Sequence, residues 1–206
     1  MYTDSADTSW VWLAREGMVP VIALAVIVWI ASVDLSVVSP WSSDPIFGNG
    51  EPAETTRSTP SGRTPSVPLV LPVAGVSASD LVDTFEDARS GGRTHHAIDI
   101  MAPSGTPVVA AAEGTVMRRR TGGLGGKSLY VVSPDTSFLY YYAHLAGYAD
   151  GAAEGMPVDA GDRLGVVGAT GNAESPHLHF AICAVDDLKR PWARHPVNPY
   201  PLLRGG

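Results

Sequence analysis

The chain has 206 residues, of which 45% are hydrophobic and 17% are charged, and its formal net charge is −7. That length allows one domain with additional segments, and the negative charge argues against a nucleic-acid partner, because binding phosphate requires a basic face. The single cysteine, Cys183, excludes an internal disulfide and a cysteine-type structural zinc site, so we expect it to be a small buried apolar residue.

Three segments precede the predicted domain. Residues 1–17 form a short polar tail, and the run that follows carries no charge from Met18 to Val33. Its length is near the lower limit of about 17 residues for a membrane-spanning helix, so we predict a transmembrane anchor over 18–38. The alternatives are a buried core helix, which an all-round apolar run disfavours, and a cleaved signal peptide, which the lack of a preceding basic cluster disfavours. Residues 39–75 are rich in proline, serine and threonine and predict a disordered, extended linker.

From residue 76 to residue 206 the pattern changes to short β-type runs separated by glycine and proline, which predicts an all-β sandwich or barrel. Turn residues at 133–136 predict a hairpin over 128–144. The glycine-rich stretch 122–128 lacks the spacing of a phosphate loop and is expected to be a flexible loop between strands. We expect residues 186–206 to wrap the edge of the domain. The other expected strands cover 94–100, 107–110, 114–119, 163–168 and 177–185.

Histidines and one aspartate carry the chemistry in this pattern. His177 and His179 flank one apolar residue in a predicted strand, so both point to one face while their neighbours enter the core. His95 and Asp99 share a face of the expected strand 94–100, whereas His96 points the other way. Two such strands side by side would gather the ligand set of a catalytic zinc ion. No His-Glu-x-x-His helix motif, no paired-cysteine motif and no Gly-x-Ser-x-Gly elbow is present.

A third histidine, His144, ends the run Tyr142–Leu145 and would, taken alone, be read as a structural residue. Further pieces in the same order are Ala102–Ala110, Gly114–Val116, Gly161–Gly171 and Pro176–Phe180, which follow His95-x-x-x-Asp99. With this set, the sequence from about 94 to 182 resembles the peptidase M23 family, the LytM or lysostaphin-like zinc endopeptidases.

The resemblance implies a compact, mostly antiparallel β domain with its site in a groove. It implies that His95, Asp99 and His179 bind Zn²⁺, while His144 and His177 act on the water and on the developing oxyanion. It further implies hydrolysis of peptide bonds in bacterial peptidoglycan, in stem peptides or cross-bridges, and therefore a domain outside the cytoplasm. Together with the apolar run over 18–38, this predicts a single-pass protein of the cell membrane. A regulatory protein partner is compatible with it.

Two positions depart from the family pattern. The family usually has glycine where this chain has Ala97, and we expect that methyl group at the groove floor. It often has glycine where Ser175 stands, which affects substrate contacts more than chemistry.

Two other functions account for part of this pattern. A non-catalytic cell-wall-binding or regulatory module of the same family is the alternative, but every ligand position here is filled. A biotinyl or lipoyl carrier domain would need a lysine at a hairpin tip, and Lys127, its only candidate, leaves the histidines unexplained.

Overall fold

A computed structural model of the chain describes residues 62–186, 188 and 194–205. The polar tail, the transmembrane anchor predicted over 18–38 and most of the predicted linker lie outside these residues. In the described part, no helix has the length and apolar character needed to cross a membrane.

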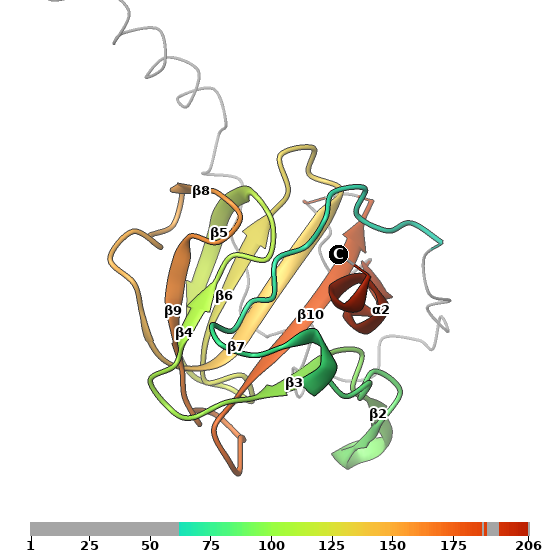
Figure 1. Cartoon of the computed structure of the whole chain (residues 1–206), viewed down its shortest axis with the longest axis vertical. Coiled ribbons are helices and arrows are strands. Elements are labelled where there is room, and N and C mark those ends of the chain that lie inside the picture. Colours follow the sequence, from blue (N-terminus) through green and yellow to red (C-terminus); the bar gives the residue numbers. More distant parts are fainter. Residues whose placement is uncertain (1–61, 187, 189–193, 206) are drawn as a thin grey trace, which may run out of the picture. The chain divides into compact units, whose positions relative to one another are not determined.

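The described residues form eleven β-strands, two 3₁₀ turns and one short α-helix (Figure 1). In chain order they are η2 (Ala78–Asp80), β1 (Ala88–Arg89), η3 (Ser90–Gly92), β2 (Arg93–Thr94), β3 (Ile98–Met101), β4 (Pro107–Val109), β5 (Gly114–Arg120), β6 (Lys127–Val132), β7 (Phe138–Tyr148), β8 (Pro157–Val158), β9 (Arg163–Val167), β10 (His177–Val185), β11 (Arg194–Val197) and α2 (Pro199–Arg204).

Nine of these strands make one sheet, whose main path runs β11-β10-β7-β6-β5-β8, with β3 beside β10 and β4 beside β9 (Figure 1). The other two, β1 and β2, form a separate hairpin. All strand pairs among the described residues are antiparallel. The prediction of an all-β, mostly antiparallel domain is therefore confirmed, and so is the hairpin made by β6 and β7.

The long strand β7 is the branch point of the sheet. Its first half pairs with β10 as far as Ala143, and its second half pairs with β9 from Leu145 onward. Between them His144 has φ 62°, and its backbone N–H donates to Gly125 O at 2.9 Å. A positive φ is uncommon for a residue other than glycine and marks a local kink. The kink sends β9 and β10 to successive halves of one strand and leaves His144 where they diverge.

Side-chain alternation divides the sheet into two packed faces. Leu178, Phe180 and Ile182 of β10 are fully buried in the main core, as the alternation predicted. A smaller cluster around Tyr141 and Ala181 fills the opposite face. Each fully buried large apolar side chain contributes roughly 1.5–3 kcal/mol. The strand that carries two of the candidate histidines is thus held firmly from both sides.

The strand expected over 94–100 is broken. β2 ends at Thr94, β3 begins at Ile98, and His96 between them has φ 52°. The backbone N–H groups of His95 and His96 donate to carbonyl groups earlier in the chain, at Asp87 and Phe85, rather than to a sheet neighbour. Local hydrogen bonding therefore overrides the alternation that we read as one continuous strand.

Segments at both ends of the described chain pack onto the sheet. Leu69 and Val73 are buried, and the backbone N–H of Val70 donates to Ala111 O at 2.8 Å, so the packed chain begins before residue 76. At the other end, β11 forms the edge of the sheet beside β10. The helix α2 follows it, with Asn198 accepting from the backbone N–H of Tyr200 as its N-cap.

Candidate active site

Two neighbouring strands set the first pair of site residues. In the antiparallel register of β3 and β10, His179 lies directly opposite Asp99, and His177 lies opposite Met101. Directly opposed residues in an antiparallel pair have their side chains within about 5 Å of each other. The register therefore brings the upstream aspartate next to the histidine pair, as predicted.

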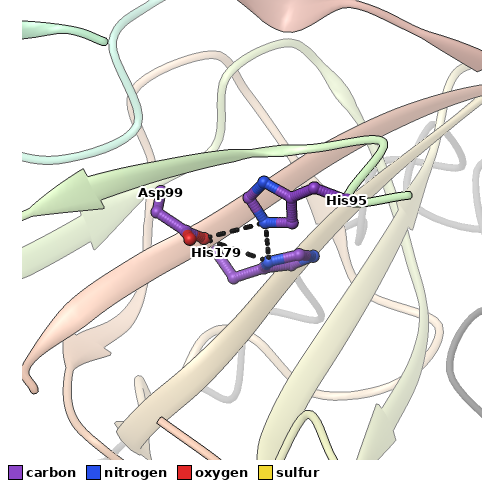
Figure 2. Close-up of side chains that lie close together, drawn as sticks. All are labelled: His95, Asp99 and His179. Carbon is purple, nitrogen blue, oxygen red and sulfur yellow. Dashed lines mark hydrogen bonds and ion pairs between the residues drawn. The ribbon is translucent and has the colours of Figure 1, made fainter. Parts of the chain in front are cut away.

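His95 reaches this pair from outside the sheet, at the end of the β1–β2 hairpin. Its Nδ1–H donates to Thr84 O at 2.8 Å, which leaves the Nε2 lone pair to face the other two residues. His95 Nε2 lies 2.9 Å from His179 Nδ1 and 3.1 Å from Asp99 Oδ1, and the last two atoms are 3.2 Å apart (Figure 2). Three candidate ligand atoms thus surround one point.

The donor set fits a zinc ion. Tetrahedral zinc with bonds of about 2.0–2.1 Å has its ligand atoms roughly 3.3 Å apart. The three separations here, 2.9, 3.1 and 3.2 Å, are close to that edge length. Among the described residues this is the cluster of histidine, aspartate, glutamate or cysteine side chains that could hold a metal. His96 is outside it, because its ring packs against Phe85 with centroids 5.5 Å apart.

The ionisation states also suit a cation. Burial alone would raise the pKa of Asp99, but hydrogen bonds with His179 and His95 outweigh it and hold that pKa well below its usual range. Burial lowers the pKa of His179 to about 4. Asp99 is therefore a carboxylate and His179 a neutral imidazole near pH 7, which are the forms that bind metals.

The remaining two histidines, His144 and His177, lie beside the cluster with ring centroids 4.8 Å apart. His144 donates from Nδ1 to Thr170 O at 2.8 Å, and burial lowers its pKa, so it is neutral near pH 7. His177 donates from Nδ1 to Ser175 O at 2.8 Å, and its Nε2 lies 3.6 Å from Asp99 Oδ1. The structure therefore brings all five residues singled out from the sequence into one place.

These residues lie in a cavity of about 370 Å³. The β1–β2 hairpin forms part of its lining, as do Leu124 and Gly125 of the glycine-rich loop and the segment 172–175. The glycine-rich loop is tied down, since Leu124 O accepts from the backbone N–H of Asn172 at 3.0 Å. Gly126, with φ 61°, approaches Gly171 so closely that a Cβ would lie 2.4 Å from the Gly171 nitrogen. The stretch that we read as a flexible connection is a fixed part of the cavity.

Ala97 does not occupy the groove floor that we expected for it. Its side chain is fully buried, packs with Tyr130, Tyr141, Ala143 and Ala181, and does not line the cavity. Ser175, in contrast, does line the cavity. Because Ala143 lies opposite His179 and Ala181 follows His179 on the same side of β10, the cluster around Ala97 packs on the face of the sheet that carries the site.

Sequence reasoning missed two groups that hold the site. Thr84 accepts from His95 through its carbonyl and from the Asp99 backbone N–H through its hydroxyl. Arg89 places an Nη2 nitrogen 2.5 Å from Asp99 Oδ2. The signal that could have found Arg89 is the Ser90–Gly92 turn, because it makes a hairpin in which Arg89 pairs with Arg93 just before His95.

Residues 93–199 match the sequence family described as Peptidase family M23. Curated relatives include an L-Ala–D-Glu endopeptidase of Bacillus subtilis, which is 32% identical over 130 residues, or 59% of this chain and 38% of the relative. Another is the DD-carboxypeptidase/endopeptidase Mpg of Neisseria meningitidis, which is 40% identical over 89 residues, or 43% of this chain and 20% of the relative. The chain thus spans well under half the length of these proteins.

A solved structure agrees with the sequence match. A crystal structure from Pseudomonas aeruginosa that carries an M23 peptidase designation superimposes with a TM-score of 0.52 at 29% identity, covering 72% of this chain and 56% of the other. The family match includes every one of the five clustered residues. This chain belongs to peptidase family M23.

Proposed function

We propose that the chain is a zinc-dependent endopeptidase that hydrolyses peptide bonds in bacterial peptidoglycan. The convergence of His95 Nε2, Asp99 Oδ1 and His179 Nδ1 on one point carries the proposal. The names of the relatives, an L-Ala–D-Glu endopeptidase and a DD-carboxypeptidase/endopeptidase, support a stem peptide or cross-bridge as the substrate.

His95, Asp99 and His179 would hold the zinc ion and leave it an open coordination position, as three-ligand catalytic sites do. Zinc in such a site supplies a Lewis acid that polarises the scissile carbonyl and acidifies a water molecule. Two neutral imidazoles and one carboxylate leave the site with a net positive charge, which favours that chemistry. A purely regulatory module would have no use for a complete ligand set of this kind.

His144 and His177 have different surroundings, and the proposal gives them different roles. His144 is buried and neutral and donates from Nδ1 to Thr170 O, so its Nε2 accepts the proton of the attacking water and returns it to the leaving amine. His177 donates from Nδ1 to Ser175 O and directs its Nε2 into the site, 3.6 Å from Asp99 Oδ1. With a proton on Nε2 it would donate to the developing oxyanion.

The place of action is part of the same proposal. A peptidoglycan substrate requires the domain to work outside the cytoplasm, and the uncharged run within 18–38 would anchor it to the cell membrane. The proline-rich stretch after it would then set the reach of the domain into the wall. Protease added to intact spheroplasts tests this: the domain should be cleaved from outside, and a domain protected until lysis would contradict the placement.

The catalytic proposal is tested by measuring zinc content and release of fragments from purified peptidoglycan in the same samples. His179→Ala should lose both zinc and activity. His144→Ala should keep zinc and lose activity by about 10²–10⁴-fold, the usual contribution of a general base. His96→Ala is the matched control, because its ring packs on Phe85 outside the cluster, and it should keep both. A His179→Ala protein with the zinc content of the parent would refute the ligand assignment.

A further inference from the structure

The two oxygens of Asp99 have separate partners. We propose that Arg89 is a positioning residue that holds Asp99 Oδ2 and thereby makes this carboxylate a one-oxygen ligand, with only Oδ1 available to the metal. The inference rests on the zinc binding proposed above, and it concerns how the ligand set is kept in its catalytic form.

The contacts divide cleanly between the two oxygens. Oδ2 lies 2.5 Å from Arg89 Nη2. Oδ1 lies 3.1 Å from His95 Nε2, 3.2 Å from His179 Nδ1 and 3.6 Å from His177 Nε2. A charge-assisted hydrogen bond of this length is among the stronger ones that a carboxylate makes. The carboxylate therefore cannot turn to present both oxygens to the metal without giving up Arg89.

Arg89 and the proposed metal ligand His95 belong to the same short stretch of chain around the β1–β2 hairpin. Arg89 ends β1, the Ser90–Gly92 turn follows, and His95 comes one residue after the end of β2. Gly91 and Gly92 have φ 76° and 72°, which only glycine adopts readily, so the turn is fixed by its sequence. The His95 backbone N–H donates to Asp87 O at 2.9 Å, which closes the base of this hairpin. Arg89 and His95 thus approach Asp99 as parts of one unit.

Loss of Arg89 would act through Asp99 in two ways. The carboxylate would be free to rotate, which weakens the preformed ligand set, and its second oxygen could occupy the position that the substrate or water needs. Removal of a group that orients a metal ligand typically lowers metal affinity by about 10–100-fold. Lysine at this position keeps the charge but lacks the planar fork, so it should restore the function only in part.

The test uses the full chain in detergent and needs no peptidase assay. Zinc affinity is measured by competition with a chromogenic chelator, and the visible spectrum of the Co²⁺-loaded protein reports the coordination. Arg93→Ala is the matched control, because Arg93 lies in the same hairpin but its side chain bonds to Ser90 instead of Asp99. Arg89→Ala should lose 10–100-fold in affinity and change the cobalt spectrum, Arg89→Lys should fall between it and the parent, and Arg93→Ala should stay within about twofold of the parent.

Two results would overturn the inference. One is an Arg89→Ala protein with the affinity and the cobalt spectrum of the parent, even if its thermal stability falls, because Arg89 would then only tether the hairpin. The other is an equal loss in Arg89→Ala and Arg93→Ala, which would assign the effect to the hairpin as a whole. If Arg89→Ala does not fold, Arg89→Lys decides alone, and parent values in that variant overturn the proposal. A parent protein that binds neither metal would instead refute the proposed function itself.

Discussion

Replacement of Ala97 by glycine tests how the chain packs between its first two proposed metal ligands. The Ala97 side chain is fully buried among Tyr130, Tyr141, Ala143 and Ala181. Its removal costs about 0.8 kcal/mol for one buried carbon. Glycine adds roughly 0.4–1 kcal/mol through the greater freedom of the unfolded chain. Ala97→Gly should therefore lower the free energy of unfolding by about 1.5 kcal/mol and leave zinc affinity and kcat/KM within about twofold of the parent.

Urea unfolding of the full chain in detergent, followed by circular dichroism, measures the first quantity, and peptidoglycan fragment release measures the last. Ala184→Gly is the matched control: Ala184 is equally buried but lies farther along β10, five positions beyond His179. It should lose a similar amount of stability and no activity. A severalfold rise in kcat/KM for Ala97→Gly alone, with stability unchanged, would show that the methyl group projects into the groove and would refute the packing argument.

Three further predictions concern pH, metal and backbone packing. Burial lowers the folded pKa of His179 to about 4, whereas an unfolded histidine has a pKa near 6.5, so the unfolded chain binds more protons between these values. The metal-free protein should therefore keep its full stability above about pH 6.5 and lose about 2 kcal/mol between pH 7 and pH 5. An unfolding free energy that is flat over this range would contradict the burial of a neutral imidazole. Free zinc at 100 times its dissociation constant should stabilise the parent by about 2.7 kcal/mol and should not stabilise His179→Ala. The unfolding midpoint with and without a chelator measures this stabilisation. Equal stabilisation of both proteins would place the ion elsewhere. Gly168→Ala should destabilise the fold by about 1–3 kcal/mol or more, because its Cβ would lie 2.3 Å from the Ala146 nitrogen. Gly147→Ala has open space around it and should be nearly neutral. The same urea titration distinguishes the two variants, and equal effects would contradict the close approach of Gly168 to Ala146.

The sequence was most informative where short-range pattern and long-range pairing agree. In β10 the alternation predicts which residues share a face: Leu178 and Phe180 enter the main core, while His179 lies opposite Asp99 on the other face. It failed where the backbone departs from a regular strand. The positive φ at His96 and at His144 follows from hydrogen bonds to Phe85 and Gly125, partners that no local periodicity reveals.

Charged side chains that support the site were the hardest to anticipate. An arginine near a histidine in sequence is usually solvated. The register of β1 with β2 places Arg89 and Arg93 opposite each other, and only their hydrogen bonds distinguish Arg89, which reaches Asp99, from Arg93, which bonds to Ser90. The same limit applies to carbonyl groups, because the sequence carries no sign that Thr84 O and Thr170 O select the tautomers of His95 and His144. These contacts depend on where loops end rather than on residue type.

The candidate site is assembled from two parts of the fold, the main sheet and the separate β1–β2 hairpin. Asp99 and His179 face each other across β3 and β10, inside a sheet whose core fixes their separation. His95 comes from the β1–β2 hairpin, which pairs with no strand of that sheet in the described chain. Neither part carries all three proposed ligands, so the proposed metal ion would join them, and its affinity would depend on how well the hairpin is fixed beforehand. The contacts of Arg89 and Thr84 with Asp99 provide that fixation from the protein side, which is why two residues without a ligand atom matter to the proposed chemistry.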